Sequence, residues 1–145
     1  MLSHSVGYAA AALGIIAAAK GKPLLIREIA NASNVPTPYL AKLIHILSRK
    51  GVVETQRGIG GGVVIIGNPK DLSLYDICNY LDDPVVRKRC MLNNGECSDE
   101  RACPCHKFWM SHRKKEIEFL KNTTIADIAR FEMKKMIRLN KRPKS

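Results

Sequence analysis

The fold of this chain is decided by residues 37–66, which read TPYLAKLIHILSRKGVVETQRGIGGGVVII. Thr37 is a good N-cap and Pro38 suits the first helical position, so the pattern predicts a helix that starts here. An apolar stripe continues this helix at helical spacing down to Arg49 and consists of Leu40, Leu43, Ile44 and Leu47. Beyond Gly51, two short β-branched runs (52–56 and 62–66) flank a glycine-rich tip, which predicts a β-hairpin.

Two further helices are expected ahead of this stretch. Residues 5–19 are alanine-rich and contain no proline, which indicates a buried helix that Gly21 and Pro23 end. Residues 25–32 carry apolar side chains at helical spacing. Three helices and a hairpin follow the element order of a winged helix-turn-helix, whose third helix enters the DNA major groove while the wing reaches the minor groove. The predicted fold class is therefore mainly α with a small β-hairpin.

The charge of the chain favours a polyanionic partner. The sequence has 24 Lys and Arg against 13 Asp and Glu, a formal charge of +11, and the basic surplus lies at both ends. We predict double-stranded DNA as the partner, contacted by the third helix (Thr37, Pro38, Tyr39, Lys42, His45, Arg49) and by the wing (Arg57, Gly58, Gly60). A solvated basic face and an ordinary hairpin are the alternative interpretation.

Two other protein classes are disfavoured. The longest apolar run, residues 6–19, is too short to span a bilayer as a helix, and no Lys or Arg precedes it as in a signal peptide, so we expect a cytoplasmic protein with no membrane contact. The sequence contains no recognisable nucleophile–base pair, phosphate-binding loop or carboxylate pair. We therefore expect neither an enzyme nor a small-molecule substrate.

Helical patterns resume after the hairpin. Ser73 with Asp76 makes a capping-box start, and Cys78 lies on the apolar face of that helix, as a core thiol does. Thr124 with Asp127 predicts a cap for the last helix, which ends in a basic tract.

A long helix is predicted over residues 107–121. It carries a stripe of Met110, Ile117 and Leu120 with Trp109 beside it, which we expect to form a two-fold dimer interface. Packing of the stripe on its own domain is the alternative. The predicted domains are a winged DNA-binding domain (1–82), a cysteine-rich cluster-binding loop (83–106), and a dimerisation helix with a basic C-terminal helix (107–145).

Four cysteines and a histidine lie in the polar loop before that helix, at Cys90, Cys97, Cys103, Cys105 and His106. Thiolates and imidazole bind soft metals, but the loop lacks the two-residue gap within each ligand pair that is typical of zinc fingers. The wider gaps favour an iron-sulfur cluster, whose negative charge the basic run 87–89 would offset. Free thiols or a redox disulfide remain the alternative.

The sequence resembles the IscR/NsrR (Rrf2) family of winged helix-turn-helix transcriptional regulators. The matching features are Leu2, Ser3, Tyr8 and Ala9, residues 26–30 (IREIA), Tyr39 with Leu40, residues 57–62 (RGIGGG), residues 72–77, and three cysteines before a long helix. The resemblance implies a homodimer that binds a palindromic operator and a cluster whose state alters DNA affinity. It covers nearly the whole chain.

By position, the resemblance also implies a ligand set. Cys90, Cys97 and Cys103 match the three cysteine ligands of the family, and His106 stands where the iron-sulfur cluster regulators have their histidine. Gly7 occupies the place of an acidic ligand in the nitric oxide responsive members. Two departures are Cys105, an additional thiol that could replace His106 as the fourth ligand, and Ala41, where some relatives carry a glutamate that tunes operator choice.

These observations predict a homodimeric DNA-binding transcriptional regulator that senses redox, iron-sulfur or nitric oxide status through a cluster of the 2Fe-2S or 4Fe-4S type. A cluster-free member of the family that senses through cysteine oxidation or a partner protein is the alternative.

Overall fold

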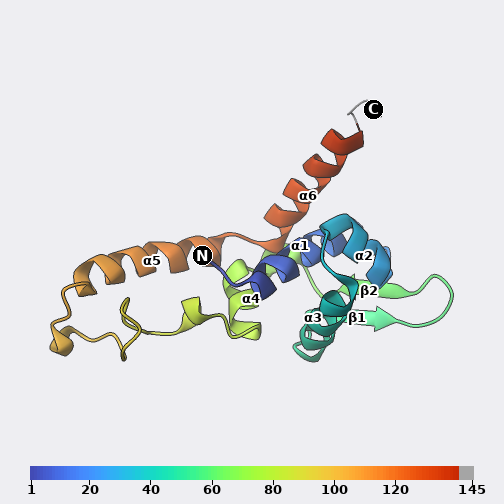
Figure 1. Cartoon of the computed structure of the whole chain (residues 1–145). Coiled ribbons are helices and arrows are strands. Elements are labelled where there is room, and N and C mark those ends of the chain that lie inside the picture. The colour runs from blue at the N-terminus through green and yellow to red at the C-terminus, as the bar shows by residue number, and fades with distance from the viewer. Residues whose placement is uncertain (141–145) are drawn as a thin grey trace.

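Six α-helices and one two-stranded hairpin make up residues 1–140, which the computed structural model describes (Figure 1). The helices are α1 (His4–Ala18), α2 (Ile26–Ser33), α3 (Thr37–Arg49), α4 (Leu74–Tyr80), α5 (His106–Asn122) and α6 (Ile125–Asn140), and the strands are β1 (Val53–Gln56) and β2 (Gly62–Ile65). The predicted fold class is confirmed. The end of the predicted basic C-terminal segment, residues 141–145, lies outside the described residues. Among residues 1–140, no helix combines the length and the apolar composition needed to cross a bilayer.

Helix α1 lies at the centre of the core. Its buried residues are Val6, Ala9, Ala12, Leu13, Gly14, Ile15 and Ile16. Helices α2, α3, α4 and α6 and strand β2 all contact it. Ser3 caps the helix, because its hydroxyl accepts a hydrogen bond from the backbone N–H of Val6 at 3.4 Å. The alanines of α1 allow its neighbours to approach closely.

Local backbone chemistry sets the turn between α2 and α3. Asn34 ends α2 in the left-handed conformation, with a φ of 57°. The prediction that Thr37 is the N-cap of α3 is wrong by one residue, because Pro36 holds that position and its carbonyl accepts a hydrogen bond from the N–H of Leu40 at 2.9 Å. Thr37 therefore lies in the first turn of α3 with an exposed side chain.

The hairpin is anchored to the segment between α1 and α2. Its strands are antiparallel, with Gln56 opposite Gly62 at the tip end. Leu24 adds a bridge to Val63 through two backbone hydrogen bonds of 3.2 and 2.7 Å. Residue 62 must be glycine, because a Cβ would lie 2.5 Å from the carbonyl oxygen of Leu24. The base of the wing is thus fixed to the helical core.

Helix α6 returns to the core, although it follows the cysteine loop in the sequence. It packs along α1 and then projects away from the body of the molecule (Figure 1). The two helices approach closely at Gly14, where an added Cβ would lie 2.7 Å from Cγ2 of Ile128. Leu120 and Ile125, at the corner between α5 and α6, are buried in the same core as α1. The core of the winged module therefore extends beyond residue 82.

The predicted capping box of α4 is present. The hydroxyl of Ser73 accepts from the N–H of Asp76 at 3.1 Å, and the Asp76 carboxylate accepts from the N–H of Ser73 at 2.9 Å. The equivalent pair of Thr124 and Asp127 starts α6. Helices α4 and α6 therefore begin with the same type of N-terminal cap, at the positions that the sequence predicts.

Cys78 is fully buried on the core side of α4. Burial, with the nearby charges of Asp83 and Glu116, raises the pKa of its thiol to about 11. The thiol stays protonated at neutral pH, which agrees with the predicted role as a core residue.

Replacing Gly14 with Ala is expected to separate α1 from α6. Helix propensity alone favours Ala over Gly by about 1 kcal/mol, but the added methyl overpacks the contact with Ile128, which typically costs about 1–3 kcal/mol. Gly7→Ala is the matched control, because nothing lies within 4 Å of a Cβ built at Gly7 on the same helix. Urea unfolding should place Gly14→Ala below Gly7→Ala in free energy of unfolding, and equal values would contradict the close helix contact.

Candidate nucleic-acid interface and cysteine site

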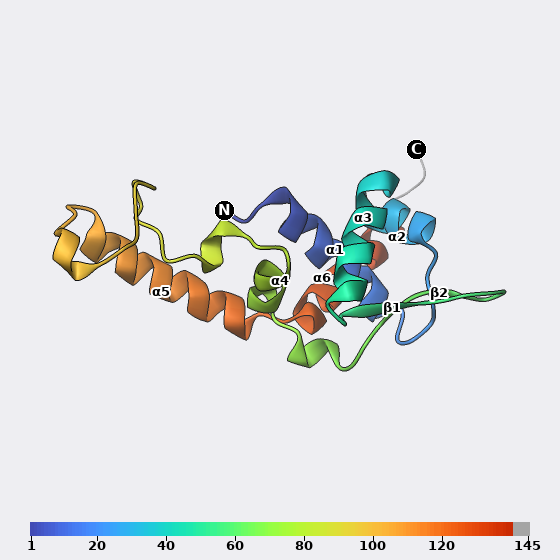
Figure 2. The same cartoon turned by 90° about the horizontal axis from the view of Figure 1, so that it is seen from below.

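The predicted DNA-facing side of α3 is exposed along the helix. Its exposed residues include Thr37, Pro38, Tyr39, Lys42, His45 and Arg49, whereas Leu40, Leu43, Ile44 and Leu47 face the core. Helix α3 contacts β1, and the wing projects beyond both elements in the two views (Figures 1 and 2). Arg57, Gly58 and Gly60 at the wing are likewise exposed. The structure thus brings the predicted helix and wing residues onto neighbouring elements.

Tyr39 is held against α1. Its hydroxyl lies 2.5 Å from the hydroxyl of Ser5, and its ring packs edge-on against Tyr8 with ring centroids 5.4 Å apart. Local sequence patterns do not predict this contact, because it joins residues that are 34 positions apart. Tyr39 therefore also fixes the position of α3 on α1.

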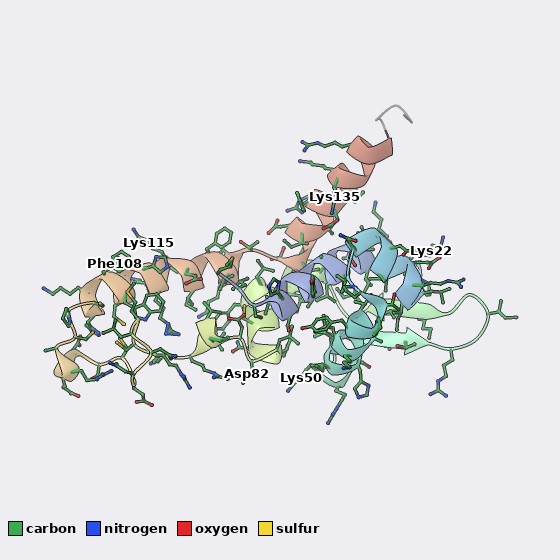
Figure 3. All side chains as sticks on the ribbon, in the orientation of Figure 1. Lys22, Lys50, Asp82, Phe108, Lys115 and Lys135 are labelled. Carbon is green, nitrogen blue, oxygen red and sulfur yellow. The ribbon has the colours of Figure 1, made fainter. Side chains whose placement is uncertain are left out.

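Two lysines add to the basic surface near these elements. Lys50 lies at the end of α3, and Lys22 lies on the side of the molecule where the wing projects (Figure 3). Both are exposed. The basic composition of residues 1–70 contains them, but helical spacing alone did not select them.

The apolar side chains of α5 are arranged differently from the predicted stripe. Leu120 is only 3% exposed and belongs to the core of its own chain. Trp109 contacts the cysteine loop, because its indole N–H donates to the carbonyl of Arg89 at 2.7 Å. Of the predicted stripe, Met110 is exposed and Ile117 is half-buried. The largest exposed apolar side chains of the helix are those of Phe108 and Phe119, each 63% exposed, and neither was predicted. Leu120 is therefore unsuitable as a dimer contact.

The cysteine loop places four of the five predicted ligands in two separate pairs. The Sγ atoms of Cys90 and Cys103 lie 3.6 Å apart, and Sγ of Cys97 lies 3.1 Å from Nδ1 of His106. All the cysteines are free thiols. Within residues 1–140, no three or more His, Cys, Asp or Glu side chains gather around a position for one metal ion. Cys105 is the N-cap residue of α5, and its side chain makes no capping hydrogen bond.

The His106 ring is oriented from both sides. Its Nε2 lies 2.6 Å from a carboxylate oxygen of Asp99, while Nδ1 faces Cys97. Because a carboxylate only accepts hydrogen bonds, Nε2 carries the proton in this contact, which leaves the lone pair of a neutral ring on Nδ1. Asp99 was not predicted, since it is joined to His106 only through the folding of the loop.

The loop is tied to the helices at its start. Arg89 and Glu96 form an antiparallel bridge, and the N–H of Cys90 donates to the carbonyl of Gly95 at 3.0 Å. The guanidinium of Arg113 donates to the carbonyl of Val85 at 3.2 Å. Helix α5 thus holds the loop segment that leads into Cys90.

Asp83 connects this segment to α1. Its carboxylate accepts hydrogen bonds from the N–H groups of Ser3 and Val85, both at 2.9 Å. Burial of Asp83 opposes ionisation, but the hydrogen bonds from Val85 and Ser3 outweigh it and lower the pKa of the carboxyl group. Since the folded-state pKa is depressed, the ionised group stabilises the fold above the unfolded pKa of about 3.9, and this contribution is lost as the pH falls through the folded value.

Asp83→Ala should lower the free energy of unfolding at pH 7 by about 1–3 kcal/mol, because two backbone donors lose their acceptor. The difference from the unaltered chain should start to shrink as the pH falls below about 4, where the Asp83 carboxylate of the unfolded chain is protonated first, and should continue to shrink toward the lower pKa of the folded chain. Urea unfolding at pH 7 and pH 3 measures both effects. Asp71→Ala, at an exposed carboxylate, is the control. A difference that stays constant across this pH range would show that ionisation of Asp83 contributes nothing.

Comparisons with known proteins agree with this architecture. Residues 2–130 match the model of the Rrf2 family, described as "Iron-dependent Transcriptional regulator". A "Putative HTH-type transcriptional regulator" of Aquifex aeolicus is 32% identical over 136 residues, covering 92% of this chain and 94% of the relative. The transcriptional regulator IscR of Klebsiella pneumoniae is 25% identical over 106 residues, covering 73% of this chain and 64% of IscR.

A solved structure resembles the chain as well. CymR, titled the global cysteine regulator of B. subtilis, superposes with a TM-score of 0.73 at 26% identity and covers 90% of this chain and 97% of its own. These relatives are named as regulators and none as an enzyme. The family match extends over the winged module, the cysteine loop and α5. The chain therefore belongs to the Rrf2 family of transcriptional regulators.

Proposed function

We propose that this transcriptional regulator binds a palindromic operator as a homodimer, and that an iron-sulfur cluster held by Cys90, Cys97, Cys103 and His106 alters its DNA affinity. The observation that carries the proposal is the pairing of these four side chains in one loop. Lys42 and the other exposed residues of α3 would contact the major groove, and Arg57 the minor groove.

The donor set fits an iron-sulfur cluster better than a single ion. Three thiols and one imidazole suit iron-sulfur ligation. One pair of thiols and one thiol–imidazole pair would supply two protein ligands to each iron of a two-iron cluster. The cluster, when bound, supplies a one-electron redox centre. Cys105 contributes to neither pair, which favours His106 as the fourth ligand. The similarity to IscR supports the same assignment.

The charge around the loop supports bound thiolates. Arg87, Lys88 and Arg89 precede Cys90 directly, and α5 begins at His106, so its N-terminal N–H groups and positive dipole end lie next to the ligands. Both features favour the deprotonated form of cysteine.

A dimer through α5 is supported by its exposed face. Phe108, His112, Lys115 and Phe119 follow one another at steps of four, three and four residues, so they share one side of the helix. Figure 3 labels Phe108 and Lys115 on this helix, and the ring of His112 stacks on Phe108 with centroids 5.9 Å apart. A second copy would cover these rings and place two winged modules at a fixed spacing.

Hydrogen bonds that link the segment before the cysteine loop to α1, and α1 to α3, support a coupling between the state of the loop and DNA binding. Asp83, seven residues before Cys90, holds the N–H of Ser3, and Ser5 in the first turn of α1 contacts Tyr39 on α3. A change that reorders the loop would therefore act on the helix that orients α3. The α3 helices of the two protomers must contact both half-sites of the operator at one fixed spacing. A small displacement of α3 would therefore lower the affinity for the operator.

A second candidate is sensing by thiol oxidation without a cluster. The 3.6 Å separation of the Cys90 and Cys103 sulfurs supports it. An oxidant such as a peroxide would take two electrons from the two thiols, which release two protons as the disulfide forms.

Cluster content separates the two candidates. After anaerobic reconstitution, the unaltered chain should contain iron and sulfide and absorb visible light, whereas Cys90→Ala, Cys97→Ala, Cys103→Ala and His106→Ala should each lose most of both. Cys105→Ala is the matched control, because it removes a thiol from the same loop and should retain the cluster.

Two results would change the assignment. Full retention in the Cys90→Ala, Cys97→Ala or Cys103→Ala variant would overturn the three-cysteine assignment, and loss in Cys105→Ala with retention in His106→Ala would reverse the fourth ligand. An iron-free chain that forms a Cys90–Cys103 disulfide on oxidation would favour the second candidate.

Phe119→Glu should convert the dimer to a monomer, since it places a charge among the aromatic side chains of the proposed interface. Lys114→Glu, at an exposed position on another side of α5, should leave the dimer intact. Sedimentation equilibrium at several concentrations measures the association. A Phe119→Glu chain that remains dimeric would locate the interface elsewhere.

A further inference from the structure

The tip of the wing carries a single side chain. Residues 58–62 read Gly-Ile-Gly-Gly-Gly, and Ile59 is completely exposed, at 110% of its reference area. Isolated exposed apolar residues are common on protein surfaces. This one is unusual because a β-branched apolar residue occupies a turn, where small and polar residues are preferred.

The surrounding glycines fix how Ile59 is presented. Gly58 and Gly60 have left-handed φ values of 94° and 76°, which other residues rarely adopt. A Cβ at Gly61 would lie 2.2 Å from the carbonyl oxygen of Gln56. The tip therefore has a defined backbone that projects Ile59 beyond the sheet, with Arg57 two residues away, directly after β1. Packing within the fold does not explain why this residue is an isoleucine, because its side chain is fully exposed among the described residues.

We propose that Ile59 is an apolar contact to the floor of the DNA minor groove and makes the wing prefer A·T over G·C pairs. This inference rests on the proposed function, in which the wing enters that groove. Proteins that bind the minor groove commonly place apolar side chains against or between base pairs. The exposed, aliphatic Ile59 on a narrow two-stranded tip has the chemistry and the placement for such a contact.

The preference for A·T follows from the groove edges. A·T and T·A pairs present only the acceptors adenine N3 and thymine O2 in the minor groove, whereas G·C adds the 2-amino donor of guanine. An aliphatic side chain pressed against that amino group would remove its water without replacing the hydrogen bond. Arg57 carries a different role, since its charge is attracted to the phosphates and to a narrow groove.

The test uses a duplex that the unaltered chain selects from a random library at fixed salt. The pairs under the wing, located by footprinting, are then made A·T, G·C or inosine·cytosine, which lacks the 2-amino group but keeps the major-groove acceptors of G·C. The unaltered chain should bind the G·C duplex about fivefold more weakly than the A·T duplex, and inosine·cytosine should restore the affinity to within about twofold. Ile59→Ser should bind the three duplexes with nearly equal affinity.

Arg57→Ala distinguishes this inference from the proposed function. It should weaken binding to all three duplexes and reduce the salt dependence of the affinity. Discrimination that persists in Ile59→Ser would overturn the role of Ile59 while leaving DNA binding intact. If the unaltered chain selects no duplex, the proposed function fails and the inference fails with it. Because the side chain of Ile59 is fully exposed, its replacement should not change stability. Equal unfolding temperatures of Ile59→Ser and the unaltered chain would verify that only the affinity has changed.

Discussion

Packing around α1 is the constraint on which the rest of the structure depends. This helix is rich in alanine and buries Gly14 against Ile128, so four helices and a strand can lie close to a single axis. Its first turn is held by polar contacts instead, with Ser3 bound to Asp83 and Ser5 bound to Tyr39. The apolar part of α1 therefore closes the core, and its polar start joins the cysteine loop to α3.

Local patterns in the sequence predicted the winged module well. Helical spacing separated the buried and exposed sides of α3, the glycine run located the hairpin tip, and the capping box at Ser73 formed as expected. Each of these features depends on residues that are close together in the chain. The one local error, at Thr37, arose because Pro36 supplies the cap position through its backbone, which side-chain preferences do not reveal.

Contacts between distant residues were harder to predict. Nothing in the apolar stripe of α5 indicates that Leu120 belongs to the core while Phe119 is exposed, because this depends on where α6 turns back. The cysteine spacing identified the loop but not the two pairs, which require the loop to fold, nor the contact of Asp99 with His106. Tyr39 was placed correctly on α3, yet its contact with Ser5 spans 34 residues.

The return of α6 to α1 has a consequence for synthesis of the protein. The chain leaves the ribosome from its N-terminus, so the apolar surface of α1 around Gly14 stays uncovered until Ile128 has emerged. All five cysteines precede Ile128 in the chain, so they emerge before it. Because domains fold as units, the nascent chain carries free thiols before its core can close. A product released before α6 would retain every predicted DNA contact and every predicted ligand, yet it would remain an unfinished fold that chaperones and proteases recognise by its open hydrophobic surface.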